Sequence, residues 1–213
     1  MRPGSEGLIY FDIVRQDLEV PVVQSSMKDG NVGYLQLSDW TENVDQKISE
    51  AVAGLKNQGA TSLVIDLRGN GGGYMEPAVA AADLFLSKGT VVSSRGRIAG
   101  TTREYNADGA TEWDGTLVLL VDRGSASSSE IFASALHDNK RCTLVGETTF
   151  GKGSVQKLFR QPDGSAIRLT VARYYTPSGA SINDEGITPD LYVHNPDSGQ
   201  DVQMEKALEL ARQ

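Results

Sequence analysis

The sequence has little histidine and almost no cysteine. Its 213 residues include two histidines, His137 and His194, and one cysteine, Cys142. A single cysteine excludes an intrachain disulfide, and its apolar surroundings predict a small buried side chain. Histidine is the usual general base or metal ligand of hydrolases. Because it is scarce here, a catalytic base of another residue type has to be considered.

Positive charge and long apolar runs are also lacking. The chain carries 20 Lys and Arg against 28 Asp and Glu, a net charge of −8, without a basic cluster in the sequence. This composition predicts no nucleic-acid partner, because phosphates demand a basic surface. No stretch approaches the ~18 apolar residues of a membrane span, and no apolar signal segment follows Met1. We expect an excised part of a longer exported protein, with a cytoplasmic protein as the alternative.

Apolar residues recur with two different periods along the chain. Continuous apolar runs predict strands buried on both faces at residues 62–67, 116–121 and 141–145. Helical spacing predicts helices at residues 44–58, 76–86, 127–137 and 201–212. Strand and helix in alternation predict an α/β fold with right-handed crossovers and a mostly parallel sheet.

Several further segments have strand character without intervening helices. They predict two short strands within residues 8–23 and single strands at residues 33–37, 155–161 and 165–175. Pro162-Asp163-Gly164 separates the last two and predicts a β-hairpin in the C-terminal half.

A glycine-rich loop at residues 69–73 follows the first buried strand. Gly69 and Gly71 fit a dinucleotide-binding fingerprint, but Tyr74 occupies its third glycine position, so that match is weak. A tight turn is the simplest alternative. A third interpretation is that bare backbone amides here face a developing oxyanion.

Residues 146–152 match the first seven positions of a phosphate-binding loop. The match fails at Gly153, where Ser or Thr is needed, and at the following segment, which is typical of a strand rather than a helix. The pattern therefore disfavours nucleotide binding. Lys152 between two glycines is still suited to close packing, and desolvation would make its amine a usable base.

Serines cluster at residues 125–129, where a buried strand meets a predicted helix. Ser127 with Glu130 forms a capping-box pattern, so a helix cap is the plain interpretation. A nucleophile at Ser127 is the alternative, because the Ser128 amide lies beside it at a helix start. His137 is ten residues along the same helix, about 15 Å away, and His194 lies in a late polar loop. Lys152 is therefore the best candidate base, since Ser–Lys pairs replace Ser–His–Asp in some enzymes.

Five ordered motifs carry a resemblance to a known family, and they occupy residues 66–73, 121–136, 145–156, 163–179 and 186–190. Together the sequence resembles the carboxyl-terminal processing (tail-specific) proteases, the S41 peptidases. The resemblance implies a crotonase/ClpP-like α/β core and a serine endopeptidase that cleaves polypeptide substrates near their C-termini. It implies no metal or cofactor, allows a homo-oligomer, and suggests the cell envelope, periplasm or thylakoid lumen as the location.

The resemblance also assigns roles to particular residues. It implies Ser127 as nucleophile, Lys152 as general base and Gln156 as a residue that orients the lysine amine. The oxyanion hole would combine the amide of Ser128 with that of Gly72 or Gly73. Gly71 stands where the family usually has proline, which leaves the choice between the two glycines open.

The resemblance divides the chain into three parts. Residues 1–29 resemble the end of a PDZ domain and its connector, 30–195 form the protease core, and 196–213 form a helical tail. Family members usually carry a PDZ domain that binds substrate tails by strand addition. A non-catalytic or latent peptide-binding module on the same fold is therefore the alternative function.

Overall fold

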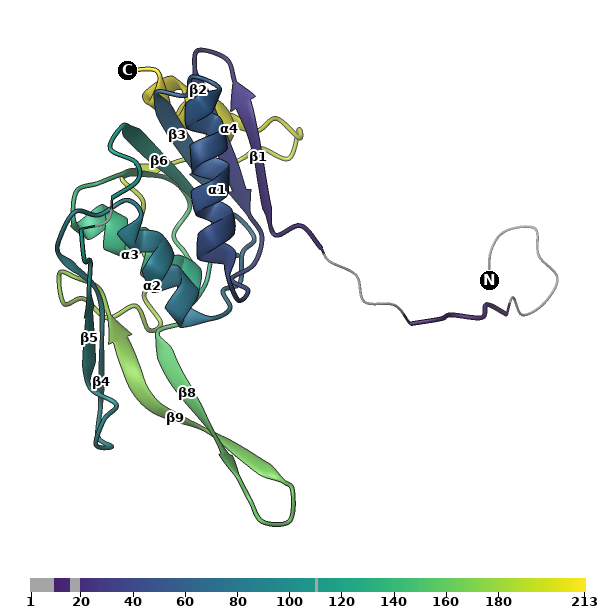
Figure 1. Ribbon diagram of the computed structural model, residues 1–213, viewed down its shortest axis with the longest axis vertical. Helices are drawn as coiled ribbons and strands as arrows, with labels where there is room; N and C mark the ends of the chain where they lie inside the picture. Colours follow the sequence, from purple (N-terminus) through teal and green to yellow (C-terminus); the bar gives the residue numbers. More distant parts are fainter. Residues whose placement is uncertain (1–9, 16–19, 110) are drawn as a thin grey trace.

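Two β-sheets of different kinds organise the structure (Figure 1). The computed structural model describes residues 10–15, 20–109 and 111–213. One sheet has six strands in the order β1-β2-β3-β6-β7-β10, and the other has four in the order β5-β4-β9-β8. In these ranges no helix combines the length and apolarity that crossing a bilayer requires.

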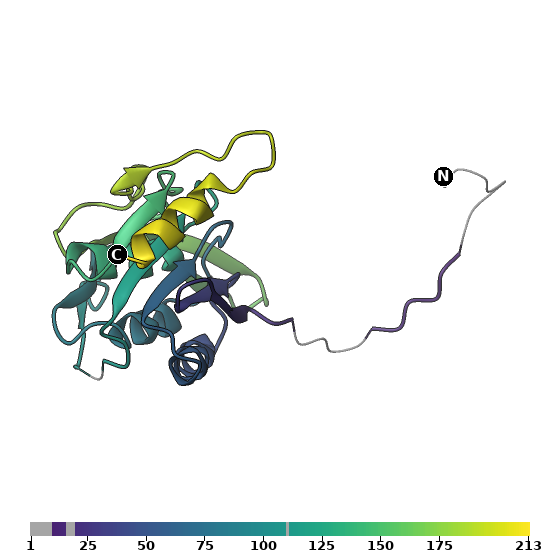
Figure 2. The ribbon, with the colours of Figure 1, turned by 90° about the horizontal axis from the view of Figure 1, so that it is seen from above.

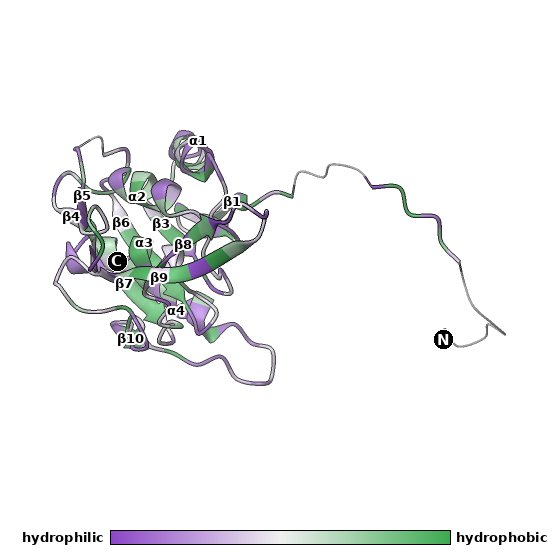
Figure 3. Ribbon diagram, turned by 90° about the horizontal axis from the view of Figure 1, so that it is seen from below, coloured by the Kyte–Doolittle hydropathy of each residue, from purple (hydrophilic) through white to green (hydrophobic). Residues whose placement is uncertain are grey.

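The six-stranded sheet is parallel except for its β1–β2 pair, as the alternating pattern predicts. Its strands are β1 (Val23–Lys28), β2 (Val32–Leu37), β3 (Ser62–Asp66), β6 (Thr116–Val121), β7 (Thr143–Gly146) and β10 (Leu191–Tyr192). Figure 3 shows apolar residues concentrated in its central strands.

Helices cover both faces of this sheet, which explains the continuous apolar runs. On β3, Leu63 and Ile65 pack into the larger core cluster, whereas Val64 packs into a second, smaller one. The larger cluster includes residues of α1 (Val44–Asn57), α2 (Met75–Asp83) and α3 (Ser128–Asp138). The smaller one includes residues of α4 (Val202–Ala211), which lies alone across the opposite face (Figure 2). Successive strand residues thus serve two cores.

The four-stranded sheet is antiparallel and reaches away from the body. Its strands are β4 (Thr90–Gly96), β5 (Arg103–Asn106), β8 (Ser154–Arg160) and β9 (Ala166–Tyr175). The predicted β8–β9 hairpin is confirmed, and it projects as a long arm (Figure 1). Large apolar side chains of this arm, Leu158, Ile167 and Leu169, are exposed.

The helix predictions are confirmed with small shifts at the ends. The prediction of two strands within residues 8–23 is wrong where it can be compared, because residues 10–15 and 20–22 form no strand and β1 begins at Val23. Residues 8, 9 and 16–19 of that segment lie outside the described residues. Strands β4 and β5 were not predicted.

Candidate active site

Ser127 occupies a strained turn between the end of β6 and α3. Its backbone has φ 57° and ψ −112°, a conformation that a non-glycine residue adopts only under constraint. The carboxylate of Asp122 stabilises the preceding turn by accepting hydrogen bonds from the amides of Gly124 and Ser125 at 2.8 and 3.0 Å. The amide of Ser127 itself donates to Oε2 of Glu130 at 2.7 Å, which is the glutamate half of the predicted capping box.

Glu130 does more than cap the helix. Its fully buried carboxylate accepts at Oε1 from the Thr149 hydroxyl at 2.6 Å and the Gly151 amide at 2.7 Å. Its Oε2 accepts from the amide of Lys152 at 2.9 Å, beside the bond from Ser127. Four donors thus satisfy one buried charge, as burial of a carboxylate requires. The same side chain fixes the backbones of both predicted catalytic residues.

The glycine loop lies directly against the Ser127 turn. A Cβ on Gly72 would stand 2.7 Å from Ser127 Cβ and 2.8 Å from the carbonyl oxygen of Ala126, so only glycine fits at this contact. The Gly72 amide donates to the side chain of buried Asn70 at 3.0 Å. Among the described residues, no protein acceptor takes the amide of Gly73 or of Ser128. These two amides are therefore available to a ligand beside Ser127.

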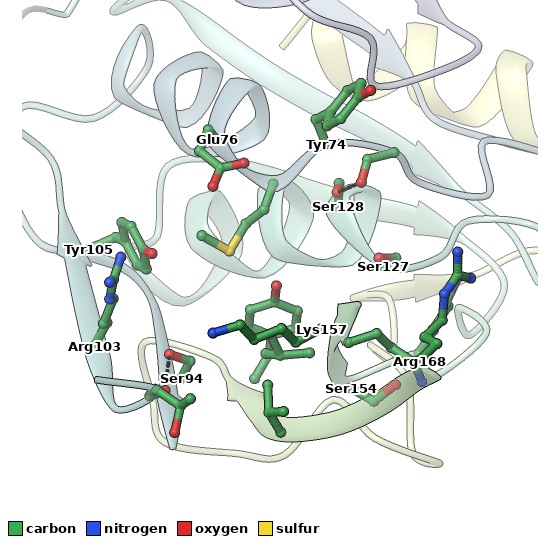
Figure 4. Close-up of a pocket in the computed structure, with 18 of the residues that line it drawn as sticks. Tyr74, Glu76, Ser94, Arg103, Tyr105, Ser127, Ser128, Ser154, Lys157 and Arg168 are labelled. Atoms are coloured by element: carbon green, nitrogen blue, oxygen red, sulfur yellow. Dashed lines mark hydrogen bonds between the residues drawn. The ribbon is translucent and has the colours of Figure 1, made fainter. Parts of the chain in front are cut away.

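Lys152 and Ser127 line one pocket, a cavity of about 520 Å³ between the four-stranded sheet and the starts of α2 and α3 (Figure 4). Gly73, Ser128 and Gln156 line it as well, so it brings together every predicted site residue except Gly72. In the described part of the chain no hydrogen bond joins Ser127 Oγ to Lys152 Nζ. The Lys152 side chain is exposed, so the predicted desolvation of its amine is absent while the pocket is open to solvent.

Close packing explains the two glycines that flank Lys152. A Cβ on Gly153 would stand 2.4 Å from the backbone nitrogen of Asn183, and Gly151 has φ 87°. Both residues lie against the loop that follows Ile182. The segment after Lys152 is strand β8 rather than the helix of a phosphate-binding loop, as the sequence indicates.

Gln156 lines the pocket, but strand alternation does not relate it to Lys152. Lys152 precedes β8, and the register shifts between Val155 and Gln156. The Gln156 side-chain amide donates to the Thr170 hydroxyl at 3.1 Å. Strand geometry therefore gives no support of its own to the orienting role that the resemblance implies for Gln156.

The two histidines pair with carboxylates outside the pocket. His137 Nε2 lies 2.9 Å from Asp190 Oδ1, and His194 pairs with Glu147. Cys142 is partly buried against the main core, and burial raises the pKa of its thiol. Within the described ranges no three His, Cys, Asp or Glu side chains gather as a metal ion would require.

An ion-pair network anchors the start of the glycine loop, and sequence reasoning missed it. Arg68 Nη2 lies 2.7 Å from Asp66 Oδ2, and its Nη1 lies 2.7 Å from Asp201 Oδ1 at the start of α4. Burial alone would raise the pKa of Asp201, but hydrogen bonds from Arg68 and from the Met204 amide hold it below its ordinary value. The motif at residues 66–73 contains the pair Asp66 and Arg68, whereas Asp201 is too distant in sequence for local patterns to find.

Comparison with known proteins places this arrangement in a family. The family model described as "Peptidase family S41" matches residues 31–193. A carboxyl-terminal-processing protease of Synechocystis is 40% identical over 97% of this chain and 51% of its own length. The carboxy-terminal processing protease CtpA of Bacillus subtilis is 38% identical over 90% of this chain and 41% of its own length.

A solved structure agrees with these sequence matches. The photosystem II D1 C-terminal processing protease superposes with a TM-score of 0.77 at 33% identity, covering 93% of this chain and 54% of that one. The chain thus spans about half the length of the relatives it matches. A family model that covers residues 31–193, together with this agreement in fold, is decisive: the chain belongs to peptidase family S41.

Proposed function

We propose that this chain is the core of a serine endopeptidase that cleaves polypeptides near their C-termini, with Ser127 as nucleophile and Lys152 as general base. The observation that carries the proposal is the meeting of Ser127, two unpaired amides and Lys152 at one pocket. The names of the relatives support the same activity and the preference for C-terminal segments.

The reaction follows from the chemistry of these groups. Neutral Lys152 removes the hydroxyl proton as Ser127 Oγ attacks the peptide carbonyl carbon. The carbonyl oxygen becomes an oxyanion that accepts hydrogen bonds from the amides of Ser128 and Gly73. Lys152 then gives the proton to the leaving amine, and water hydrolyses the acyl-enzyme with Lys152 again as base.

Gly73 is a better oxyanion donor than Gly72. The Gly72 amide already donates to Asn70, whereas the Gly73 amide has no acceptor in the described chain. Gly72 serves instead by allowing the loop to approach Ser127 closely. Gln156 is proposed to orient the Lys152 amine once a substrate lies in the pocket they share.

A bound substrate would also complete the base. Lys152 is exposed in the free protein, where water solvates its amine. A peptide in the pocket would displace water from the amine, and loss of water disfavours a charged ammonium. Substrate binding and activation of the base are therefore coupled in this proposal.

Active-site labelling and two substitutions test the mechanism. Ser127→Ala and Lys152→Ala should each lower kcat for a quenched peptide by about 10⁴-fold or more. A fluorophosphonate should label Ser127 in the parent protein and leave Ser127→Ala unlabelled. Ser26→Ala, at an exposed serine of β1, is the control and should keep full activity.

The outcomes separate the enzyme from a peptide-binding module on the same fold. Peptide binding without cleavage or labelling by the parent protein would favour the non-catalytic module. Cleavage retained by folded Lys152→Ala would contradict the Ser–Lys pair while leaving a peptidase in place.

A further inference from the structure

Positive charge gathers on the four-stranded sheet, although it is scattered along the sequence. Residues 90–106 and 154–175, which form this sheet and its turns, contain seven Lys and Arg and two acids. The whole chain has 20 Lys and Arg and 28 Asp and Glu. The fold therefore sets a basic surface beside the pocket of an acidic protein.

Three of these cations line the pocket itself. Arg103 comes from β5, Lys157 from β8 and Arg168 from β9. Figure 4 shows Arg103 at the edge formed by β5, the Lys157 amine directed toward that side, and Arg168 at the opposite edge. Among the described residues, Glu76 is the one acidic residue of the pocket lining.

These cations have no ionic partner within the described part of the chain. Arg103 donates from Nε to the Gly100 carbonyl at 3.1 Å, which leaves its two terminal nitrogens unused by any hydrogen bond there. Lys157 lies 5.6 Å from the centre of the Phe159 ring, a weak contact at an exposed site. No carboxylate of a described residue lies within 4.0 Å of any of the three. Unpaired cations that converge on a pocket favour an anionic ligand.

We propose that Arg103 and Lys157 bind a carboxylate of the peptide substrate, foremost the α-carboxylate at its C-terminus. The proposal rests on the function above, since it places a peptide in the pocket beside Ser127. A guanidinium takes a carboxylate through two parallel hydrogen bonds, and the lysine amine adds a charge from the neighbouring strand. The apolar side chains of Met75, Val171 and Tyr174 line the same pocket and would receive the side chains next to that carboxylate.

This arrangement gives the core its own means of recognising a chain end. A free C-terminus differs from an internal segment by its negative charge, which the pocket cations can detect directly. Arg168, on the opposite edge, adds to the general attraction rather than to the paired contact. Selection of cleavage sites near C-termini then depends on two side chains of the exposed sheet.

Equilibrium binding tests the proposal separately from catalysis. The probe is a fluorescein-labelled octapeptide of alanine and serine, measured by anisotropy with the folded Ser127→Ala variant of the full chain. It is prepared as a free acid, as a C-terminal amide, and as an amide with aspartate as its last residue. The free acid should bind about tenfold more tightly than the amide, the difference expected for one charge-assisted contact.

Substitutions assign this preference to the two cations. Arg103→Gln and Lys157→Gln, each combined with Ser127→Ala, should bind the acid and the amide equally, with affinity for the amide unchanged. Arg160→Gln is the matched control, because Arg160 is exposed on the same strand as Lys157 outside the pocket. It should keep the preference.

Each outcome decides the proposal. Tight binding of the aspartate amide would show that a side-chain carboxylate serves as well as the terminal one, and weak binding would restrict the ligand to the chain end. Equal affinity for all three probes, no saturable binding of the free acid, or a preference that survives both glutamine variants would overturn the proposal. Loss of cleavage with this preference intact would contradict only the proposed catalytic function.

Discussion

The two sheets contribute different halves of the candidate active site. The six-stranded sheet supplies the Ser127 turn and the glycine loop from the carboxyl ends of β6 and β3. The four-stranded sheet supplies Gln156 and the cations Arg103, Lys157 and Arg168. Lys152 lies in the loop just before β8. The first sheet is buried under helices on both faces, whereas the second is largely exposed.

This difference separates two physical tasks. Stabilising an oxyanion needs amides held rigidly, and a buried parallel sheet provides such fixed positions. Receiving a peptide needs accessible strands, unpaired charge and exposed apolar groups, which the projecting sheet provides. Glu130 is the buried side chain that joins the two halves, because its carboxylate contacts the backbones of both Ser127 and Lys152.

Loss of the Glu130 carboxylate should lower kcat more than a change in the glycine loop or in the Arg68–Asp201 ion pair. Each carboxylate oxygen of Glu130 accepts two hydrogen bonds, so the Glu130→Gln side chain must place its NH₂ group at one of these positions. In either orientation the NH₂ group then faces two donors and cannot accept from them. We expect kcat to fall about 10²-fold, the loss typical of a catalytic group misplaced by about 1 Å. Stability should fall by about 1–3 kcal/mol, because buried donors lose their acceptor. Peptide cleavage and urea unfolding measure the two effects.

Labelling distinguishes positioning from a simple loss of folded protein. The fluorophosphonate reaction rate of Ser127 should fall in Glu130→Gln under conditions where circular dichroism shows the variant folded. Glu112→Gln, which alters an exposed carboxylate bonded to Ser49, is the matched control and should react at the parent rate. An unchanged rate in folded Glu130→Gln would contradict the positioning role.

The two sheets also differ in how far the sequence predicts them. Strands β3 and β6 are apparent as continuous apolar runs because residues such as Leu63 and Val64 are buried on opposite faces. The β8–β9 hairpin is apparent because Pro162, Asp163 and Gly164 form a local turn signal. Strand β4 was missed, because its partner β9 lies about 80 residues later and its own segment is only partly buried.

Prediction of the site has the same limit. Local patterns at Ser127 and Lys152 indicate a helix cap and an incomplete phosphate loop. Exclusion of the two histidines makes Lys152 the best candidate base, and the ordered family motifs were needed to assign the two residues their roles. The cap by Glu130 was predictable because Ser127 is three residues away. Its bonds to Thr149, Gly151 and Lys152 were not, since that loop meets it only in the folded chain.

A substitution in the glycine loop tests only the half of the site that the six-stranded sheet supplies. We expect a smaller effect on kcat than for Glu130→Gln. In Gly72→Ala the new Cβ would overlap Ser127 Cβ and the Ala126 carbonyl oxygen at a residue with φ 101°. We expect kcat to fall at least about tenfold, through displacement of one oxyanion donor, and stability to fall by about 1–3 kcal/mol. Binding of the free-acid peptide to the four-stranded sheet should not change.

Gly71→Ala is the matched control for this loop. A Cβ at Gly71 meets nothing within 4 Å, and this residue has no positive φ. Its kcat and stability should stay at the parent values. If Gly71→Ala and Gly72→Ala lower kcat equally, flexibility of the loop rather than contact with Ser127 controls the site.

The smallest effect is expected at the ion pair between Arg68 and Asp201. Asp201→Asn weakens the contact between Arg68 and α4 but leaves Arg68 paired with Asp66. The pKa of Asp201 is lowered in the folded state, so its contribution is present above the ordinary carboxyl pKa and is lost as the pH falls through the folded-state value. Because the Asp201 side chain is 45% exposed, we expect Asp201→Asn to lower the free energy of unfolding by about 0.5–1 kcal/mol at pH 7.

The pH dependence of unfolding checks this sign. The parent and Asp201→Asn should differ in urea midpoint at pH 7 and converge as the pH falls below about 4. Asp197→Asn, on the exposed loop before α4, should match the parent throughout. Because Arg68 stays paired with Asp66 at the start of the glycine loop, peptide cleavage at pH 7 should be unchanged. A fall in kcat with little loss of stability would instead show that the contact between Arg68 and Asp201 controls the position of the glycine loop.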